Sequence, residues 1–130
     1  MSLNGIISQR LDNKQDRFFA TGTALGSTAT ITSDGFRAGS LGGAVEIALI
    51  ADAAITNAAD LTISVTASST LGGSYTEVQN VVIGAGTIAA DAEFFTYTPD
   101  TSVPHYMKVA VTTAEDLSAK AITGTLHYTA

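Results

Sequence analysis

Residues 61–78, LTISVTASSTLGGSYTEV, form the stretch that most constrains how this chain can fold. Leu61, Ile63 and Val65 alternate with small hydroxyl-bearing residues. Because successive side chains of a β-strand point to opposite faces, this alternation predicts a strand with one buried and one solvated face. Serine, threonine and glycine then interrupt the pattern, and β-prone residues resume at Tyr75. The stretch therefore predicts two strands joined by a loop, and neither strand carries a reactive residue.

Similar β-prone runs recur from Arg17 onward, separated by turns that contain glycine, serine, aspartate or proline. Regular spacing of this kind predicts an all-β sandwich or barrel. Asp34-Gly35 is a clear turn signal, and segments 57–62 and 112–121 are each compatible with one helical turn. We expect about eight strands, the first opening at Phe18 and the others over residues 28–32, 45–50, 61–67, 75–83, 94–97, 106–111 and 122–127.

The first 16 residues differ from the rest and are assigned to an N-terminal arm, with one β-domain over residues 17–130. Apolar residues at Leu3, Ile6, Ile7 and Leu11 have helix-like spacing. A segment this short is not stable alone, so its apolar side chains must dock on another surface. Two interpretations stay open: the arm docks on its own domain, or it reaches a neighbouring subunit.

Charge and composition exclude several functional classes. Charged residues make up 14% of the 130-residue chain, against about 25% in an ordinary soluble domain. The net charge is −6, with +1 in the first 37 residues and −7 in the remainder, and only six residues are basic. A nucleic-acid interface needs clustered lysine and arginine, so we expect no nucleic-acid partner. The absence of cysteine excludes disulfides and thiolate chemistry.

Neither a targeting segment nor a membrane segment is expected. Residues 1–9 lack the basic region and the long apolar region of a signal peptide. The apolar run at 44–54 is too short to span a bilayer and contains Glu46 and Asp52. We therefore expect synthesis in the cytoplasm and no membrane partner. A surface poor in charge and rich in small residues suits close contact with other proteins, although a compositional bias without a role gives the same pattern.

Residue types that carry chemistry are few. His105 and His127 lack the HxH or HxxxH spacing of metal ligands. The acids at 91–93 and 115–116 lie in turn-like surroundings, where solvated carboxylates are usual. The glycines of GTALGS and GAGT lack the spacings that bind nucleotide phosphates. We expect no catalytic residue, no cofactor and no metal, and therefore no enzyme.

Two longer stretches, VEIALIADAAITNAADLTISVTASSTLGGSYTEV (45–78) and HYMKVAVTTAEDLSAKAITGTLHYT (105–129), carry a resemblance to a known family. The chain resembles the jelly-roll capsid cement, or decoration, proteins of tailed bacteriophages over residues 17–129. The resemblance implies an eight-stranded antiparallel jelly-roll sandwich without catalytic residues. It also implies small oligomers, dimers or trimers, bound to the major capsid protein on the outside of an HK97-like shell in the virion.

The arm is our candidate contact segment with the shell or a neighbouring copy. The residues assigned to this contact are Leu3, Ile6, Ile7, Arg10, Leu11, Lys14, Arg17, Phe18 and Phe19. One alternative is another virion part, such as a tail or fibre-head module. A second alternative is a carbohydrate-binding jelly roll, in which an exposed aromatic pair lines a groove. The aromatic residues considered for that groove are Phe94, Phe95, Tyr97 and Tyr106.

Overall fold

The computed structural model describes residues 17–37, 45–99 and 102–128, and within these ranges every regular element is a β-strand. No helix in the described ranges is long and apolar enough to cross a membrane. The described strands are β1 (Arg17–Ala24), β2 (Thr30–Thr32), β3 (Phe36–Arg37), β4 (Val45–Ala51), β5 (Ile55–Asn57), β6 (Leu61–Ser68), β7 (Thr76–Ile83), β8 (Gly86–Ile88), β9 (Glu93–Tyr97), β10 (Tyr106–Thr113) and β11 (Ala121–Tyr128).

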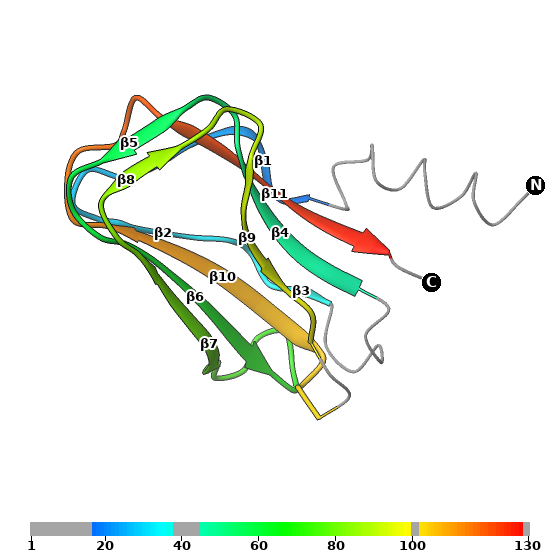
Figure 1. Cartoon of the computed structure of the whole chain (residues 1–130). Coiled ribbons are helices and arrows are strands. Elements are labelled where there is room, and N and C mark those ends of the chain that lie inside the picture. The colour runs from blue at the N-terminus through cyan, green and yellow to red at the C-terminus, as the bar shows by residue number, and fades with distance from the viewer. Residues whose placement is uncertain (1–16, 38–44, 100–101, 129–130) are drawn as a thin grey trace, which may run out of the picture.

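Two antiparallel sheets face each other (Figure 1). One has the strand order β1-β11-β4-β9, and the other has the order β2-β10-β6-β7, with β3 also paired to β10. The β5–β8 ribbon closes one end of the sandwich, and β11 ends at the opposite end (Figure 1). The predicted all-β class is confirmed, and the structure makes it an antiparallel sandwich.

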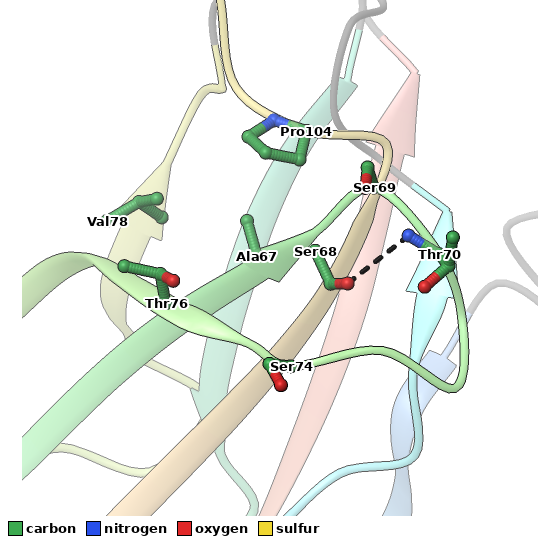
Figure 2. Close-up of a pocket in the computed structure, with 8 residues that line it drawn as sticks. All are labelled: Ala67, Ser68, Ser69, Thr70, Ser74, Thr76, Val78 and Pro104. Carbon is green, nitrogen blue, oxygen red and sulfur yellow. Dashed lines mark hydrogen bonds between the residues drawn. The ribbon is translucent and has the colours of Figure 1, made fainter.

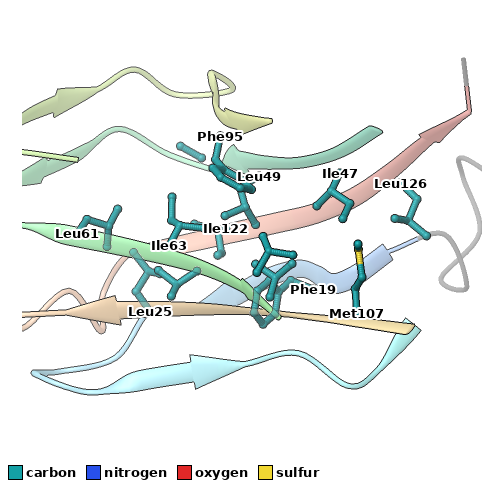
Figure 3. Packing of buried hydrophobic residues seen from close by; sticks show 14 of the residues in the cluster. Phe19, Leu25, Ile47, Leu49, Leu61, Ile63, Phe95, Met107, Ile122 and Leu126 are labelled. Atoms are coloured by element: carbon teal, nitrogen blue, oxygen red, sulfur yellow. The ribbon is translucent and has the colours of Figure 1, made fainter. Parts of the chain in front are cut away.

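The core lies between the two sheets and follows the predicted alternation. Leu61, Ile63 and Val65 of β6 are fully buried, whereas the hydroxyl-bearing residues between them are partly exposed. Ile47 and Leu49 of β4 face them from the other sheet, also fully buried (Figure 3). Burying one such side chain stabilises the fold by about 1.5–3 kcal/mol, so the inward rows of the two sheets hold the sandwich together.

Every region in which a strand was expected contains one, namely β1, β2, β4, β6, β7, β9, β10 and β11. Three further strands, β3, β5 and β8, have only two or three residues each. These three have too few residues to show an alternation, so the sequence pattern alone does not reveal them.

The Asp34-Gly35 turn prediction is wrong. β2 and β3 both pair antiparallel with β10, so the chain keeps its direction between them. Residues 33–35 oppose only two residues of β10, and the extra residue forms a β-bulge in an edge strand. Ser33 bridges the bulge, because its N–H donates to the Val109 carbonyl at 2.9 Å and its hydroxyl accepts from the Val109 N–H at 2.9 Å.

The helical-turn prediction for 57–62 is wrong, because β-strands and bends occupy these positions. Segment 112–121 contains strand residues, bends and an isolated bridge at Asp116, and its one hydrogen-bonded turn has the Lys120 N–H donating to the Leu117 carbonyl at 2.9 Å. Side chains and neighbouring loops also bind the local backbone. The Asn57 amide donates to the carbonyls of Ala59 and Gly84, and the Leu117 N–H donates to the Gly26 carbonyl. Asparagine in such a position competes with helix formation.

Candidate binding surface

The outward face of the β2-β10-β6-β7 sheet carries small, uncharged side chains in two rows across the four strands. We call these eight residues the hydroxyl face: Thr30, Thr112, Thr62 and Val82 in one row, and Thr32, Ala110, Ser64 and Asn80 in the next. All eight are partly or fully exposed, and six of them carry a hydroxyl or amide group. The face can therefore approach another surface closely and form neutral hydrogen bonds with it.

The carboxylate next to this face is already hydrogen-bonded. Glu77 of β7 accepts hydrogen bonds from the Ser64 hydroxyl at 2.8 Å and from the Asn80 amide at 3.0 Å. The bonds from Asn80 and Ser64 lower the pKa of Glu77 below its ordinary value of 4.5. On the far edge of the face, the hydroxyl oxygens of Thr30 and Thr112 lie 2.7 Å apart.

The β6–β7 loop, residues 69–75, folds over the same sheet. The Lys108 ammonium lies 4.5 Å from the centre of the Tyr75 ring, in cation–π geometry. The Tyr75 hydroxyl donates a 2.7 Å hydrogen bond to the Leu71 carbonyl. A Cβ at Gly35 would lie 2.7 Å from both the Leu71 Cδ1 and the Tyr75 hydroxyl oxygen. Close packing against this loop therefore explains why residue 35, where a turn was wrongly predicted, is a glycine.

An open pocket of about 430 Å³ lies at the base of the loop (Figure 2). The Thr70 N–H donates to the Ser68 hydroxyl at 3.2 Å, which holds one rim. Five of the eight lining residues carry a hydroxyl, and none is charged or aromatic. Its lining residues are Ala67, Ser68, Ser69, Thr70, Ser74, Thr76, Val78 and Pro104. Such a lining can hydrogen-bond a neutral group, but it has no acid, base or nucleophile activated by a neighbour.

Sequence reasoning did not identify the exposed apolar residues near this site. Among the described residues, the large hydrophobic side chains that stand exposed are Leu71 (55%), Val78 (36%) and Val82 (56%). All three belong to the β6–β7 loop or to β7, which is an edge strand. Alternation separates the two faces of β7 but does not say which face another element covers. The sequence contained only one hint of exposed apolar residues, namely that apolar residues of β7 fall on both faces of the strand.

The two histidines lie in different parts of the sandwich. His105 is exposed just before β10, whereas His127 is on β11, with its Nε2 3.8 Å from the Glu93 carboxylate and 3.0 Å from the Thr125 hydroxyl. In the described ranges, no group of three or more histidine or acidic side chains is arranged to hold a metal ion.

The acidic pair at 115–116 binds donors of the neighbouring loops. Glu115 accepts the Ala58 N–H at 2.8 Å, which ties two loops together. Asp116 accepts the side-chain and backbone donors of Ser118 at 2.6 and 3.0 Å, and these bonds lower the pKa of Asp116 below its ordinary value of 3.8. Asp91 has a φ of 62° in an exposed turn. The hydrogen bonds explain the carboxylates of Glu115 and Asp116 by local structure.

The aromatic residues proposed for a sugar groove do not share one. Phe95 is buried, and Phe94 and Tyr97 of the same strand pack against the core. Tyr106 belongs to β10 in the other sheet. The geometry therefore gives no support to a carbohydrate-stacking platform built from these rings.

The arm residues from Leu3 to Lys14 lie outside the described residues. Arg17 begins β1, and the Phe18 ring stacks on Phe36 at 4.9 Å between centres, which links the two sheets. Phe19 is only 5% exposed and belongs to the core of its own domain. A side chain buried in this way has almost no surface left for a partner, so Phe19 is removed from the candidate contact residues.

Comparisons with known proteins add little. No protein-family model matches the sequence, and no curated protein matches it. One solved structure with a similar course of the chain is described as the crystal structure of PirA. It superposes with a TM-score of 0.45 at 13% sequence identity, covering 81% of this chain and 88% of that chain. At this level the likeness carries no inference about function.

Proposed function

We propose that this chain is a structural virion protein, a capsid cement protein that binds the outside of an HK97-like bacteriophage shell and stabilises it. The observation that carries the proposal is the hydroxyl face, a broad sheet surface with small side chains and no charge. Charged residues are depleted at the centres of protein interfaces. Small side chains also leave the backbone of the sheet open to close approach by another surface. The family resemblance supplies the identity of the partner, the major capsid protein.

A rigid sandwich suits this role. A protein that binds only the assembled shell stabilises that state by mass action. Repetition over the shell lets contacts of modest strength act together. The role requires a surface that is complementary to the shell, and it requires no catalytic residue. The carboxylates of Glu115 and Asp116, which accept backbone N–H groups, are compatible with this role. We place the protein on the capsid exterior after synthesis in the host cytoplasm, as a dimer or trimer.

We also propose that the sandwich is a jelly roll. β3 continues the course of β2 along β10, and β5 and β8 form a separate ribbon. With these set aside, eight strands remain, and numbering them 1 to 8 along the chain turns the sheet orders into 1-8-3-6 and 2-7-4-5. Two interlocked Greek keys produce this order, which supports the proposal.

Binding to shells tests the function directly. Undecorated heads of the phage that encodes the chain are mixed with purified protein, and bound protein is measured by sedimentation. Thr112→Lys puts a long charged side chain on the hydroxyl face, and we expect about tenfold weaker binding or worse. Thr96→Lys is the matched control, because Thr96 is an exposed strand residue of the opposite sheet.

Two results would contradict the proposal: wild-type protein that does not sediment with the heads, and Thr112→Lys protein that binds as well as the control. A reconstruction of the particle separates the proposal from a tail or fibre-head module. Cement protein gives density repeated over the shell, whereas a tail component gives density at one vertex.

A further inference from the structure

β7 is the outer strand of its sheet, and it has the longest regular free edge among the described strands (Figure 1). Residues 79–83 pair with β6 one by one without a register shift. The other outer strands of the two sheets are β1, β9 and the β2–β3 segment. Each of them is interrupted, and none keeps more than three consecutive pairs. Because such irregularities hinder the addition of another strand, β7 is the edge best able to accept one.

The edge of β7 also lacks the side chains that normally protect an outer strand. Residues 78–90 contain no aspartate, glutamate, lysine, arginine or proline, although the chain has a net charge of −6. A bulge precedes residue 79, but residues 79–83 contain none. Natural proteins block exposed edges with charge, proline or bulges, because an open edge pairs with other strands. An edge without these features is suited to a partner strand.

One contact shows which backbone groups of this edge are free. The Asn80 N–H donates to the side-chain oxygen of Gln79 at 3.1 Å, so it points away from β6. Alternate residues of an antiparallel ladder direct their N–H and C=O groups to the same side, so those of Val82 also point away from β6. Asn80 and Val82 therefore offer two donors and two acceptors to a strand laid beside β7.

A second copy fits these groups under a two-fold axis that passes Val81 and is perpendicular to the sheet. Asn80 of each copy then lies opposite Val82 of the other, and the two pairs exchange four backbone hydrogen bonds. Val81 faces its own counterpart in a non-hydrogen-bonded pair. Glu77 is the one charged residue of β7. The two copies of Glu77 are about 27 Å apart along the ribbon, well beyond the screening length at physiological salt.

We propose that two copies of this chain associate edge to edge through β7, which joins their β2-β10-β6-β7 sheets into one continuous sheet. Because the axis is perpendicular to this sheet, the hydroxyl faces of both copies lie on the same side and stay open. The contact of one strand is smaller than the roughly 800 Å² per partner of a standard interface, so the dimer is weak and concentration-dependent. The use of the widened face on a shell rests on the proposed function, whereas the pairing itself does not.

Disulfide trapping of the full chain tests the register, because the chain contains no cysteine. Val81→Cys places two thiols in a non-hydrogen-bonded pair, with a Cα separation of about 4.5 Å that a disulfide bridges. Val81 is partly exposed, so oxidant reaches the thiols. Thr76→Cys is the matched control, because Thr76 is an exposed residue of the same strand whose two copies lie about 34 Å apart. Under mild oxidation, Val81→Cys should form covalent dimers about tenfold faster than the control.

Two double variants give an independent test that leaves Val81 unchanged. Asn80→Asp with Val82→Asp sets like charges opposite each other in both cross-strand pairs, whereas Asn80→Lys with Val82→Asp sets opposite charges there. Sedimentation equilibrium measures the dissociation constants over the micromolar to millimolar range. The like-charged variant should dissociate about tenfold more readily than the wild type, and the oppositely charged variant should dimerise at least as well as the wild type.

Three results would each overturn the proposal: a wild type that is monomeric throughout this range, equal cross-linking of the two cysteine variants, or equal dissociation of the two double variants. All measurements use purified protein without heads. A failure of the pairing therefore leaves the shell-binding test with Thr112→Lys unaffected, and a failure of shell binding leaves the dimer measurements unaffected.

Discussion

The ring of Phe18 fills the space that a side chain at Gly124 would occupy. A Cβ at Gly124 would lie 2.7 Å from the Phe18 Cδ2, inside van der Waals contact. Gly124 lies in β11 opposite Leu49 of β4, so the ring of Phe18 reaches the centre of the first sheet. The stack of Phe18 on Phe36 then joins this sheet to the second.

Gly124→Ala should therefore destabilise the fold by about 1–3 kcal/mol, because the added methyl group overpacks the sandwich against the ring. Urea unfolding measures the change in free energy of unfolding. Gly84→Ala is the control, because nothing lies within 4 Å of a Cβ at that site. Phe18→Leu should reduce the effect of Gly124→Ala. Equal stability of the two alanine variants would contradict the overpacking.

Thr28→Gly should raise the free energy of unfolding by about 1 kcal/mol. Thr28 has a φ of 49°, and a β-branched residue in this left-handed region is strained by about 1–2 kcal/mol. The Thr28 N–H still donates to the Glu115 carbonyl in the variant, so the hydrogen bond is kept. Thermal unfolding compares it with Thr30→Gly, which should lower the stability because β2 loses a β-branched residue. A less stable Thr28→Gly protein would show that the strain is not relieved.

Stability should fall as the pH drops below the ordinary pKa values of Glu77 and Asp116, 4.5 and 3.8. Both pKa values are lowered in the folded state by hydrogen bonds to the carboxylates. Their contribution is therefore present above the unfolded pKa and is lost as the pH falls through the folded pKa. Glu77→Gln with Asp116→Asn should show a shallower decline in this range. Parallel urea titrations at several pH values measure it, and an unchanged slope would count against these contacts.

Deletion of residues 1–16 should leave a folded domain that no longer decorates heads. The described core begins at Phe19, so the deletion removes none of its members. Near-identical thermal unfolding with loss of co-sedimentation is the expected result. Undiminished decoration would refute the role of the arm as the contact segment.

The class of the fold was readable from the sequence because strand alternation is a local property. The alternation of Leu61, Ile63 and Val65 predicts β6 whatever strands lie beside it. The serine- and glycine-rich residues after them predict the loop. The expectation that the chain carries no catalytic residue rests on spacing and composition, and it stays a prediction. The Asp34-Gly35 turn failed because a bulge and a hairpin turn use similar residues, and only pairing with β10 separates them.

The candidate surface was decided by tertiary structure alone. Whether Val82 is core or surface depends on which face of β7 the opposite sheet covers, and whether Phe19 is available to a partner depends on the packing of β1. The row formed by Lys108, Thr66 and Glu77 brings together residues from three strands. The sequence by itself determined that this chain builds strands with one apolar face. The order of those strands decided which surface remains open, because burial depends on contacts between residues far apart in the chain.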